Sequence, residues 1–210
     1  MQKTKAISQQ VIKRLPRYYS YLGYLLESGT LRVSSMELAE QMSLTASQIR
    51  QDLNHFGCFG QQGYGYNVKV LREEIGRILG LDRTYDMIII GAGNLGQALA
   101  NYTKFEDMGF VIKAIFDINL EICGKRIGSC EVKHIDELEA YASGNSIDIA
   151  VLTIRSKNCQ EVANRLADIH VKAIWNFASF DLRASKGVVV EDVHLSDSLM
   201  MLSYSLSNNV

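Results

Sequence analysis

The 210-residue sequence has few of the residues that build metal or redox sites. Its four cysteines are scattered and form no C-x-x-C pair, so neither a zinc site nor a redox dithiol is expected, and reduced thiols in a cytosol fit best. No segment has the apolar core of a signal peptide, and no run approaches the ~18 apolar residues of a membrane span. We therefore expect a cytoplasmic protein with no metal and no membrane partner.

Acidic residues are absent from the first 26 positions, which carry five lysines and arginines. The net charge of −1 shows no global attraction to polyanions, so this local excess of basic residues matters more for nucleic-acid binding. A solvated helix face would produce the same charge pattern. The basic segment is thus compatible with DNA binding but does not establish it.

Proline is also nearly absent, since Pro16 is the only one in the chain. Apolar residues recur at three-to-four spacing from Leu15 to Leu26, which predicts a helix. We expect Pro16 in the first turn of this helix, where its missing N–H costs nothing, and Gly29 just beyond the end.

Two short helices are predicted next by their capping residues. Ser34 and Glu37 form an S-x-x-E capping box, and Thr45 and Gln48 form a T-x-x-Q box eleven residues later. This spacing is typical of a helix-turn-helix, although two capped helices also occur in bundles that touch no DNA. The segment 56–68, "FGCFGQQGYGYNV", then places glycines among aromatics, which favours a tight two-stranded loop and hence a winged helix.

The second of these helices turns polar side chains away from the core, because Ile49, Leu53 and Phe56 share its inward face. Any surface helix has a polar face, but Asn and Gln can bind adenine and Arg can bind guanine in the major groove. The predicted DNA-binding residues lie on this helix and on the wing: Thr45, Ser47, Gln48, Arg50, Gln51, Asn54, His55, Gln61, Gln62 and Tyr64.

From residue 83 onward, apolar strands alternate with helices, which predicts a parallel sheet covered on both faces. Gly91, Gly93 and Gly96 form G-x-G-x-x-G at the first strand-to-helix turn, and Asp117 ends the next strand about twenty residues on. These glycines allow a tight turn and close approach to a pyrophosphate, while Asp117 would accept ribose hydroxyls and disfavour NADP. The prediction is NAD(H); folds that bind S-adenosylmethionine or FAD use related loops and remain alternatives.

The C-terminal segment carries an apolar stripe with no further element to cover it. Leu195, Leu199, Leu202 and Leu206 share one face of a terminal helix. Docking on a second copy of the chain would bury this face, and folding back on its own domain is the alternative.

An enzyme is the weaker interpretation. The few histidines offer no clear acid–base group, and no substrate domain of roughly 100 residues follows the nucleotide-binding pattern. A small NAD-dependent oxidoreductase with an accessory helical domain remains the alternative to a DNA-binding protein.

Long stretches of the sequence resemble the Rex family of redox-sensing transcriptional repressors, from near residue 8 to the end. They include "RLPRYYSYLGYLLESG", "GAGNLGQALANY", "WNFA" and "VHLSDSLMMLSYSL". The resemblance implies an α/β protein with an N-terminal winged helix-turn-helix domain (1–82), a Rossmann dinucleotide-binding domain (83–192) and a C-terminal dimerisation helix (193–210) swapped onto a partner. It also implies a homodimer that binds double-stranded operator DNA with NAD⁺ or no cofactor bound and is released by NADH.

The resemblance extends the predicted cofactor site beyond the glycine turn. Tyr102 matches the family tyrosine that responds to the nicotinamide. The full set of predicted NAD(H)-binding residues is Gly91, Ala92, Gly93, Asn94, Leu95, Gly96, Tyr102, Asp117, Thr153, Asn176, Phe177 and Ala178.

Two positions of the family's redox switch differ in this chain. Many members have an arginine where Ser20 stands and an aspartate where His194 stands, and this pair takes part in the switch. That ion pair cannot form here. Because Tyr102 is present, we expect redox sensing to act through a different partner.

Other departures lie near the cofactor and in the wing. Arg155 and Ser179 stand where prolines are common in the family, so the cofactor-facing loops are expected to differ. Gln61 and Gln62 replace basic wing residues and would attract phosphate less. We expect a variant operator or reduced affinity, and not a loss of DNA binding.

Overall fold

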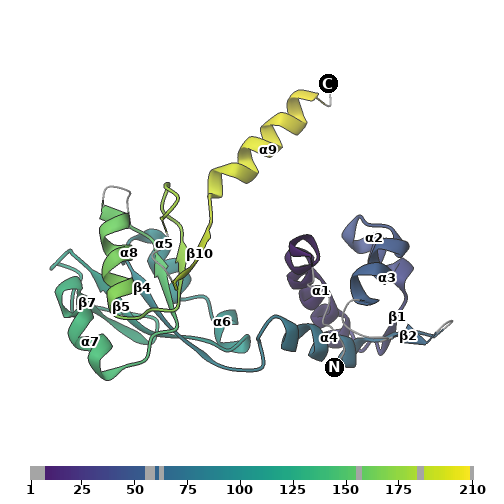
Figure 1. Cartoon of the computed structure of the whole chain (residues 1–210), viewed down its shortest axis with the longest axis horizontal. Coiled ribbons are helices and arrows are strands. Elements are labelled where there is room, and N and C mark those ends of the chain that lie inside the picture. Colours follow the sequence, from purple (N-terminus) through teal and green to yellow (C-terminus); the bar gives the residue numbers. More distant parts are fainter. Residues whose placement is uncertain (1–7, 55–59, 62–63, 155–157, 184–186, 209–210) are drawn as a thin grey trace. The chain divides into compact units, whose positions relative to one another are not determined.

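The computed structural model describes residues 8–54, 60–61, 64–154, 158–183 and 187–208 (Figure 1). The chain divides into two compact units, Met1–Arg83 and Thr84–Val210, which are described separately.

The N-terminal unit is a winged helix. Its elements are α1 (Gln9–Glu27), β1 (Arg32–Val33), α2 (Ser35–Met42), α3 (Ala46–Asn54), β2 (Gly60–Gln61), β3 (Gly65–Asn67) and α4 (Val68–Ile78). The strands form an antiparallel sheet in the order β1-β3-β2. Helices α2 and α3 follow each other across a short turn, and β2 and β3 supply the wing, so the predicted winged helix-turn-helix is confirmed.

The capping residues explain where α2 begins. The Ser34 hydroxyl accepts from the Glu37 N–H, and the Glu37 carboxylate accepts from the Ser34 N–H, which completes the predicted capping box. The helix ends at Ser43, which adopts the left-handed conformation with φ 54°.

Helix α1 begins earlier than the sequence predicted. Ser8 caps its N-terminus, so Pro16 lies in the helix interior and its predicted place in the first turn is wrong. An interior proline removes one helical hydrogen bond and ordinarily costs about 3 kcal/mol. Burial of Leu15, Tyr18 and Leu22 along one side of α1 offsets this cost, because tertiary packing supplies most helical stability in proteins.

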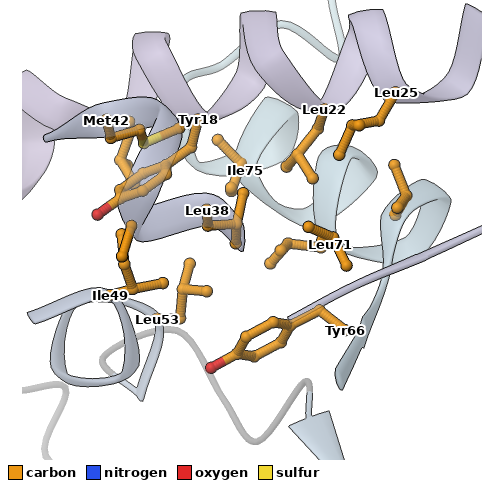
Figure 2. Close-up of a cluster of buried hydrophobic side chains, with 14 residues drawn as sticks. Tyr18, Leu22, Leu25, Leu38, Met42, Ile49, Leu53, Tyr66, Leu71 and Ile75 are labelled. Atoms are coloured by element: carbon orange, nitrogen blue, oxygen red, sulfur yellow. The ribbon is translucent and has the colours of Figure 1, made fainter. Parts of the chain in front are cut away.

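A single apolar core holds the N-terminal unit together, with contributions from all four helices and β3 (Figure 2). Tyr18 and Leu22 of α1 face Leu38 of α2 and Leu71 of α4, while Tyr66 closes the core from the wing. The positions of α2, α3 and the wing are therefore fixed by one shared set of contacts.

The C-terminal unit is a Rossmann fold. Its elements are β4 (Tyr85–Ile90), α5 (Asn94–Ala100), α6 (Lys104–Asp107), β5 (Phe110–Asp117), β6 (Arg126–Ile127), β7 (Cys130–His134), the 3₁₀ turn η1 (Ile135–Glu137), α7 (Leu138–Gly144), β8 (Ile149–Leu152), α8 (Cys159–Asp168), β9 (Ala173–Asn176), β10 (Val189–Asp192) and α9 (Leu195–Asn208). The sheet order is β10-β9-β8-β4-β5-β7-β6, and its neighbours pair in parallel except β6 with β7. Two separate apolar clusters cover its two faces, as the continuous apolar strands predicted.

Two local predictions for this unit were incomplete. The sequence "NLGQALANYTKF" predicts one helix over 94–105, but α5 ends at Ala100 and α6 begins at Lys104, so Tyr102 lies in the turn between them. The strands β6, β7 and β10 were not predicted, because they are short or carry polar residues at alternate positions.

Candidate nucleotide and nucleic-acid sites

The glycine turn follows the carboxyl end of β4 and leaves no room for two side chains. Gly91 has φ 105°, and a Cβ there would lie 2.9 Å from the Thr153 Oγ1 and from a methyl carbon of Ile154. A Cβ at Gly96 would overlap the carbonyl oxygen of Gly91. Gly96 is needed for the start of α5 to pack against the turn after β4, and Gly91 is needed for that turn to pack against the chain after β8.

Gly93 differs from its two neighbours, because a Cβ at this position would meet no protein atom within 4 Å. It borders a cavity of about 490 Å³ at the carboxyl ends of β4, β5 and β8. The strand order reverses between β4 and β8, and such a switch point is where α/β sheets bind ligands. The lining residues are Ile90, Gly91, Gly93, Phe116, Asp117, Ile118, Ile135, Thr153, Ile154, Asn158, Glu161, Val162 and Arg165.

Asp117 is held beside the glycine turn by backbone hydrogen bonds. Its Oδ2 accepts from the Ala92 N–H at 2.6 Å, and its Oδ1 accepts from the Asn119 N–H at 2.8 Å. The Thr153 hydroxyl braces the turn from β8 by donating to the Gly91 carbonyl at 2.8 Å. A ligand-sized cavity, an open glycine and a fixed carboxylate are together what a dinucleotide requires, so these residues fit NAD(H).

The structure brings only part of the predicted cofactor set to this cavity. Gly91, Gly93, Asp117 and Thr153 line it; Ala92, Asn94, Leu95 and Gly96 belong to the same turn and helix start; Tyr102, Asn176, Phe177 and Ala178 do not line it. The sequence reasoning missed the apolar walls, among them Ile118, which is 75% exposed directly after Asp117. The available sequence signal was an apolar residue directly after the acid that ends the second strand of the motif.

Asn176 ends β9 and is completely buried. Its amide nitrogen donates to the Phe180 carbonyl at 2.8 Å and to an Asp192 oxygen at 2.6 Å, and its amide oxygen accepts from the Ala178 N–H at 3.0 Å. These bonds occupy the amide, so Asn176 shapes the loop after β9 and ties it to β10.

Helix α3 exposes four of the predicted DNA-binding side chains, Arg50 among them. Ser47, Gln51 and Asn54 lie on its exposed face, while Ile49 and Leu53 are buried as predicted. These exposed positions form one continuous stripe of the kind that reads a major groove.

Two side chains of this set are engaged within the protein. Arg50 is exposed but donates to the Ser35 hydroxyl at 3.0 Å, and Gln48 is half-buried and donates to Asp52 at 2.9 Å. The Thr45 hydroxyl accepts from the Gln48 N–H at 3.1 Å and caps α3. Asp52, which the sequence analysis did not single out, is fully buried.

The wing is described only in part, because His55, Phe56, Gln62 and the side chain of Gln61 lie outside the described residues. Tyr64 is 69% exposed, and its carbonyl accepts from the Arg32 guanidinium at 3.1 Å. Arg32 therefore provides a cation beside the wing that the sequence analysis overlooked.

Comparisons with known proteins bear on both sites together. The CoA binding domain model matches residues 82–180, and a model for the N-terminus of DNA-binding proteins matches residues 6–54. The redox-sensing transcriptional repressor Rex of Clostridium novyi is 53% identical over 207 residues, which cover 99% of each chain. That of Clostridioides difficile is 56% identical over 200 residues, or 95% of each chain. This chain belongs to the Rex family.

Solved structures of a Rex-family repressor, RSP, match the chain closely. RSP in complex with beta-NAD⁺ and operator DNA is 54% identical, with a TM-score of 0.91 and coverage of 98% of this chain and 94% of that one. RSP in complex with beta-NADH is 51% identical, with a TM-score of 0.89 and coverage of 98% and 96%. These Rex relatives are transcriptional repressors and not enzymes, which argues against the oxidoreductase alternative.

The last helix, α9, has exposed side chains along its described length. No described residue of α9 is buried, and Leu195, Leu199, Leu202 and Leu206 are each more than half exposed. The alternative in which this helix folds back on its own domain is therefore not seen in the described part of the chain.

The two departures from the Rex switch residues are visible in the structure. Ser20 is exposed on α1, and His194 contacts the Asp181 carboxylate at 2.8 Å. This hydrogen bond raises the pKa of His194 above its usual value, with the nearby Asp197 and Asp192 adding to the effect. His194 thus has an acidic partner in its own chain.

Among residues 8–54, 60–61, 64–154, 158–183 and 187–208, no three His, Cys, Asp or Glu side chains gather as metal ligands would. Within the same ranges, no helix combines the length and apolar character needed to cross a bilayer.

Proposed function

We propose that this chain is a homodimeric repressor that binds operator DNA through α3 and the wing and leaves it when NADH occupies the cavity at the glycine turn. The observation that carries the proposal is the open position at Gly93 beside Asp117, in a chain that also folds as a winged helix. Rex relatives are redox-sensing repressors, and RSP binds NAD⁺, NADH and operator DNA. We place the protein in the cytoplasm, where DNA and NADH are both available.

Different residues of the cavity contact different parts of the dinucleotide. The backbone at Gly91 and Gly93 approaches the pyrophosphate, and Asp117 accepts the adenosine ribose hydroxyls. A 2′-phosphate would place negative charge against this carboxylate, so NADH is bound in preference to NADPH. Ile118 and Ile135 supply apolar contact for the adenine ring.

Homodimer formation follows from the exposed α9. A helix with an apolar stripe is stable only when another surface covers that stripe, and a second copy provides one in a closed symmetric pair. The dimer also presents two α3 helices to two operator half-sites. Leu199→Glu is expected to convert the dimer to monomers in analytical ultracentrifugation, and a persistent dimer would exclude α9 from the interface.

Tyr102 is the proposed sensor of the nicotinamide. NADH and NAD⁺ differ by one hydride and one positive charge, and a ligand shifts a conformational equilibrium only through different affinity for the two states. Tyr102 is 48% exposed and begins a row of aromatic rings in contact. The ring centroids lie 4.8 Å apart for Tyr102 and Phe105, 5.8 Å apart for Phe105 and Trp175, and 4.6 Å apart for Trp175 and Phe177. This row connects the turn after α5 with the loop after β9.

The test is reciprocal coupling between NADH and DNA. Coupling of about 1–3 kcal/mol changes operator affinity roughly 5- to 150-fold, and operator must weaken NADH by the same factor. NADH affinity is measured by titration with and without operator, in the parent and in Tyr102→Phe, with NADPH as the negative control. Equal NADH affinities with and without operator in the parent would end the proposal, and undiminished coupling in Tyr102→Phe would remove its hydroxyl from the mechanism.

A further inference from the structure

Asp52 is a completely buried carboxylate on α3 for which the proposed function has no use. Its Oδ2 accepts from the Arg14 Nε at 2.7 Å and from the Tyr18 hydroxyl at 2.8 Å. Its Oδ1 accepts from the Arg14 Nη2 at 2.8 Å and from the Gln48 Nε2 at 2.9 Å. A carboxylate offers about four lone-pair sites, so every acceptor site of Asp52 is filled.

This carboxylate is charged at neutral pH. Burial acts against the charged form, but the hydrogen bonds from Arg14, Gln48 and Tyr18 outweigh burial and lower the pKa of Asp52. A charged carboxylate only accepts hydrogen bonds. Gln48 must therefore turn its NH₂ group toward Asp52, and its carbonyl oxygen points away from that carboxylate.

Gln48 does not complete the capping box that the sequence predicted. The Thr45 hydroxyl accepts from the Gln48 N–H, but the Gln48 side chain bonds Asp52 and not the Thr45 backbone. Among the described residues, its carbonyl oxygen has no hydrogen-bond partner. Gln48 is half-buried, and its helix neighbours Ser47 and Gln51 are exposed.

We propose that Asp52 is a positioning residue for base reading, which fixes the Gln48 amide so that its carbonyl oxygen is offered to the major groove. A free glutamine binds adenine with both amide groups, through N6 and N7. One N–H of the Gln48 amide is bound to Asp52, which sets the orientation of the amide. The carbonyl oxygen can then accept from the exocyclic amino group of adenine or cytosine. The inference rests on the proposed function of α3 as the operator-reading helix.

The experiment is a selection of operator sequences from random duplexes, with the full-length dimer and its variants. The parent should select adenine or cytosine at one position of each half-site, and Gln48→Met should lose that preference by roughly 2- to 10-fold, the worth of one hydrogen bond. Asp52→Asn should lose the preference at the same position. Tyr18→Phe is the matched control, because it removes one bond to Asp52 and spares Gln48, so it should keep the preference.

A second measurement does not depend on Asp52→Asn and holds even where that variant does not fold. Where the selected base is adenine, purine in its place lacks the amino group that the Gln48 carbonyl oxygen would accept from, and it should weaken binding in the parent and not in Gln48→Met.

Several results would overturn the inference: selection of guanine or thymine at the Gln48 position, unchanged binding with purine, no effect of Gln48→Met, or a folded Asp52→Asn that keeps the preference. A parent that selects no sequence would instead overturn the proposed function, and the inference with it.

Discussion

The two sites of this protein are built in opposite ways. The nucleotide turn depends on side chains that are absent, because a Cβ at Gly96 would overlap the Gly91 carbonyl and the space at Gly93 stays open. Helix α3, the proposed DNA-reading helix, depends on side chains that are present and bound, since Asp52 holds both Arg14 and Gln48. The first site should therefore fail by steric overlap and the second by loss of orientation, and the following changes test this difference.

The largest effect is expected from Gly96→Val. Its side chain would separate α5 from β4, so we expect the C-terminal unit to lose about 3 kcal/mol or more of unfolding free energy, together with NADH binding. The measurement is denaturation followed by fluorescence of Trp175, the only tryptophan, which reports on this unit. Gly144→Ala, whose Cβ would meet no atom within 4 Å, is the control and should be near neutral.

Gly93→Val separates ligand binding from folding. Gly93 has φ −70°, which valine adopts without strain, so denaturation should match the parent. Its side chain would enter space needed by the pyrophosphate, and NADH affinity should fall at least ~100-fold, or about 2.7 kcal/mol. Release from operator by NADH should disappear as well. Normal NADH titration of this variant would place the pyrophosphate elsewhere.

These two sites also differ in how well the sequence predicts them. The spacing of Gly91, Gly93 and Gly96 reports backbone geometry directly, so the turn and the place of Asp117 at the end of the next strand could be predicted from the sequence. The same is true of the Ser34 capping box, whose partners lie within four residues.

The Asp52 cluster could not be predicted in this way. Its partner Arg14 lies 38 residues earlier in the chain, and periodicity within α3 gives no information about which residue of α1 packs there. An aspartate before the buried Leu53 looks like an ordinary surface residue of a short helix. The interior Pro16 was misplaced for a related reason, because packing across helices outweighed its local preference.

Acid should weaken the N-terminal unit through Asp52. Its pKa is lowered from 3.8 by folding, so its contribution to stability is complete above that value and is lost as the pH falls from about 4 through the folded pKa. Thermal melts followed by circular dichroism at pH 7 down to pH 3 measure this loss, with Trp175 fluorescence reporting the other unit. Asp52→Asn should lower stability at pH 7 by about 1–3 kcal/mol and flatten the acid dependence. An unchanged acid dependence in the variant would assign the loss to other carboxylates.

The smallest effects are expected at Arg50, an exposed side chain of α3 that is held by one hydrogen bond within the protein. Arg50 is exposed and also donates to the Ser35 hydroxyl at 3.0 Å, so its proposed contact with operator and its orientation can be tested separately. Arg50→Ala removes the DNA contact itself, and we expect operator affinity to fall roughly 10-fold, within the 1–3 kcal/mol of a good base contact. Ser35→Ala removes only the tether, which orders a long side chain before binding, and should cost about 2-fold. NADH affinity should stay unchanged in both, because neither residue belongs to the Rossmann unit.

The double variant tests whether Ser35 acts through Arg50. If it does, Ser35→Ala has no further effect on operator affinity once Arg50 is alanine. Two independent losses of operator affinity would show that Ser35 contacts DNA on its own.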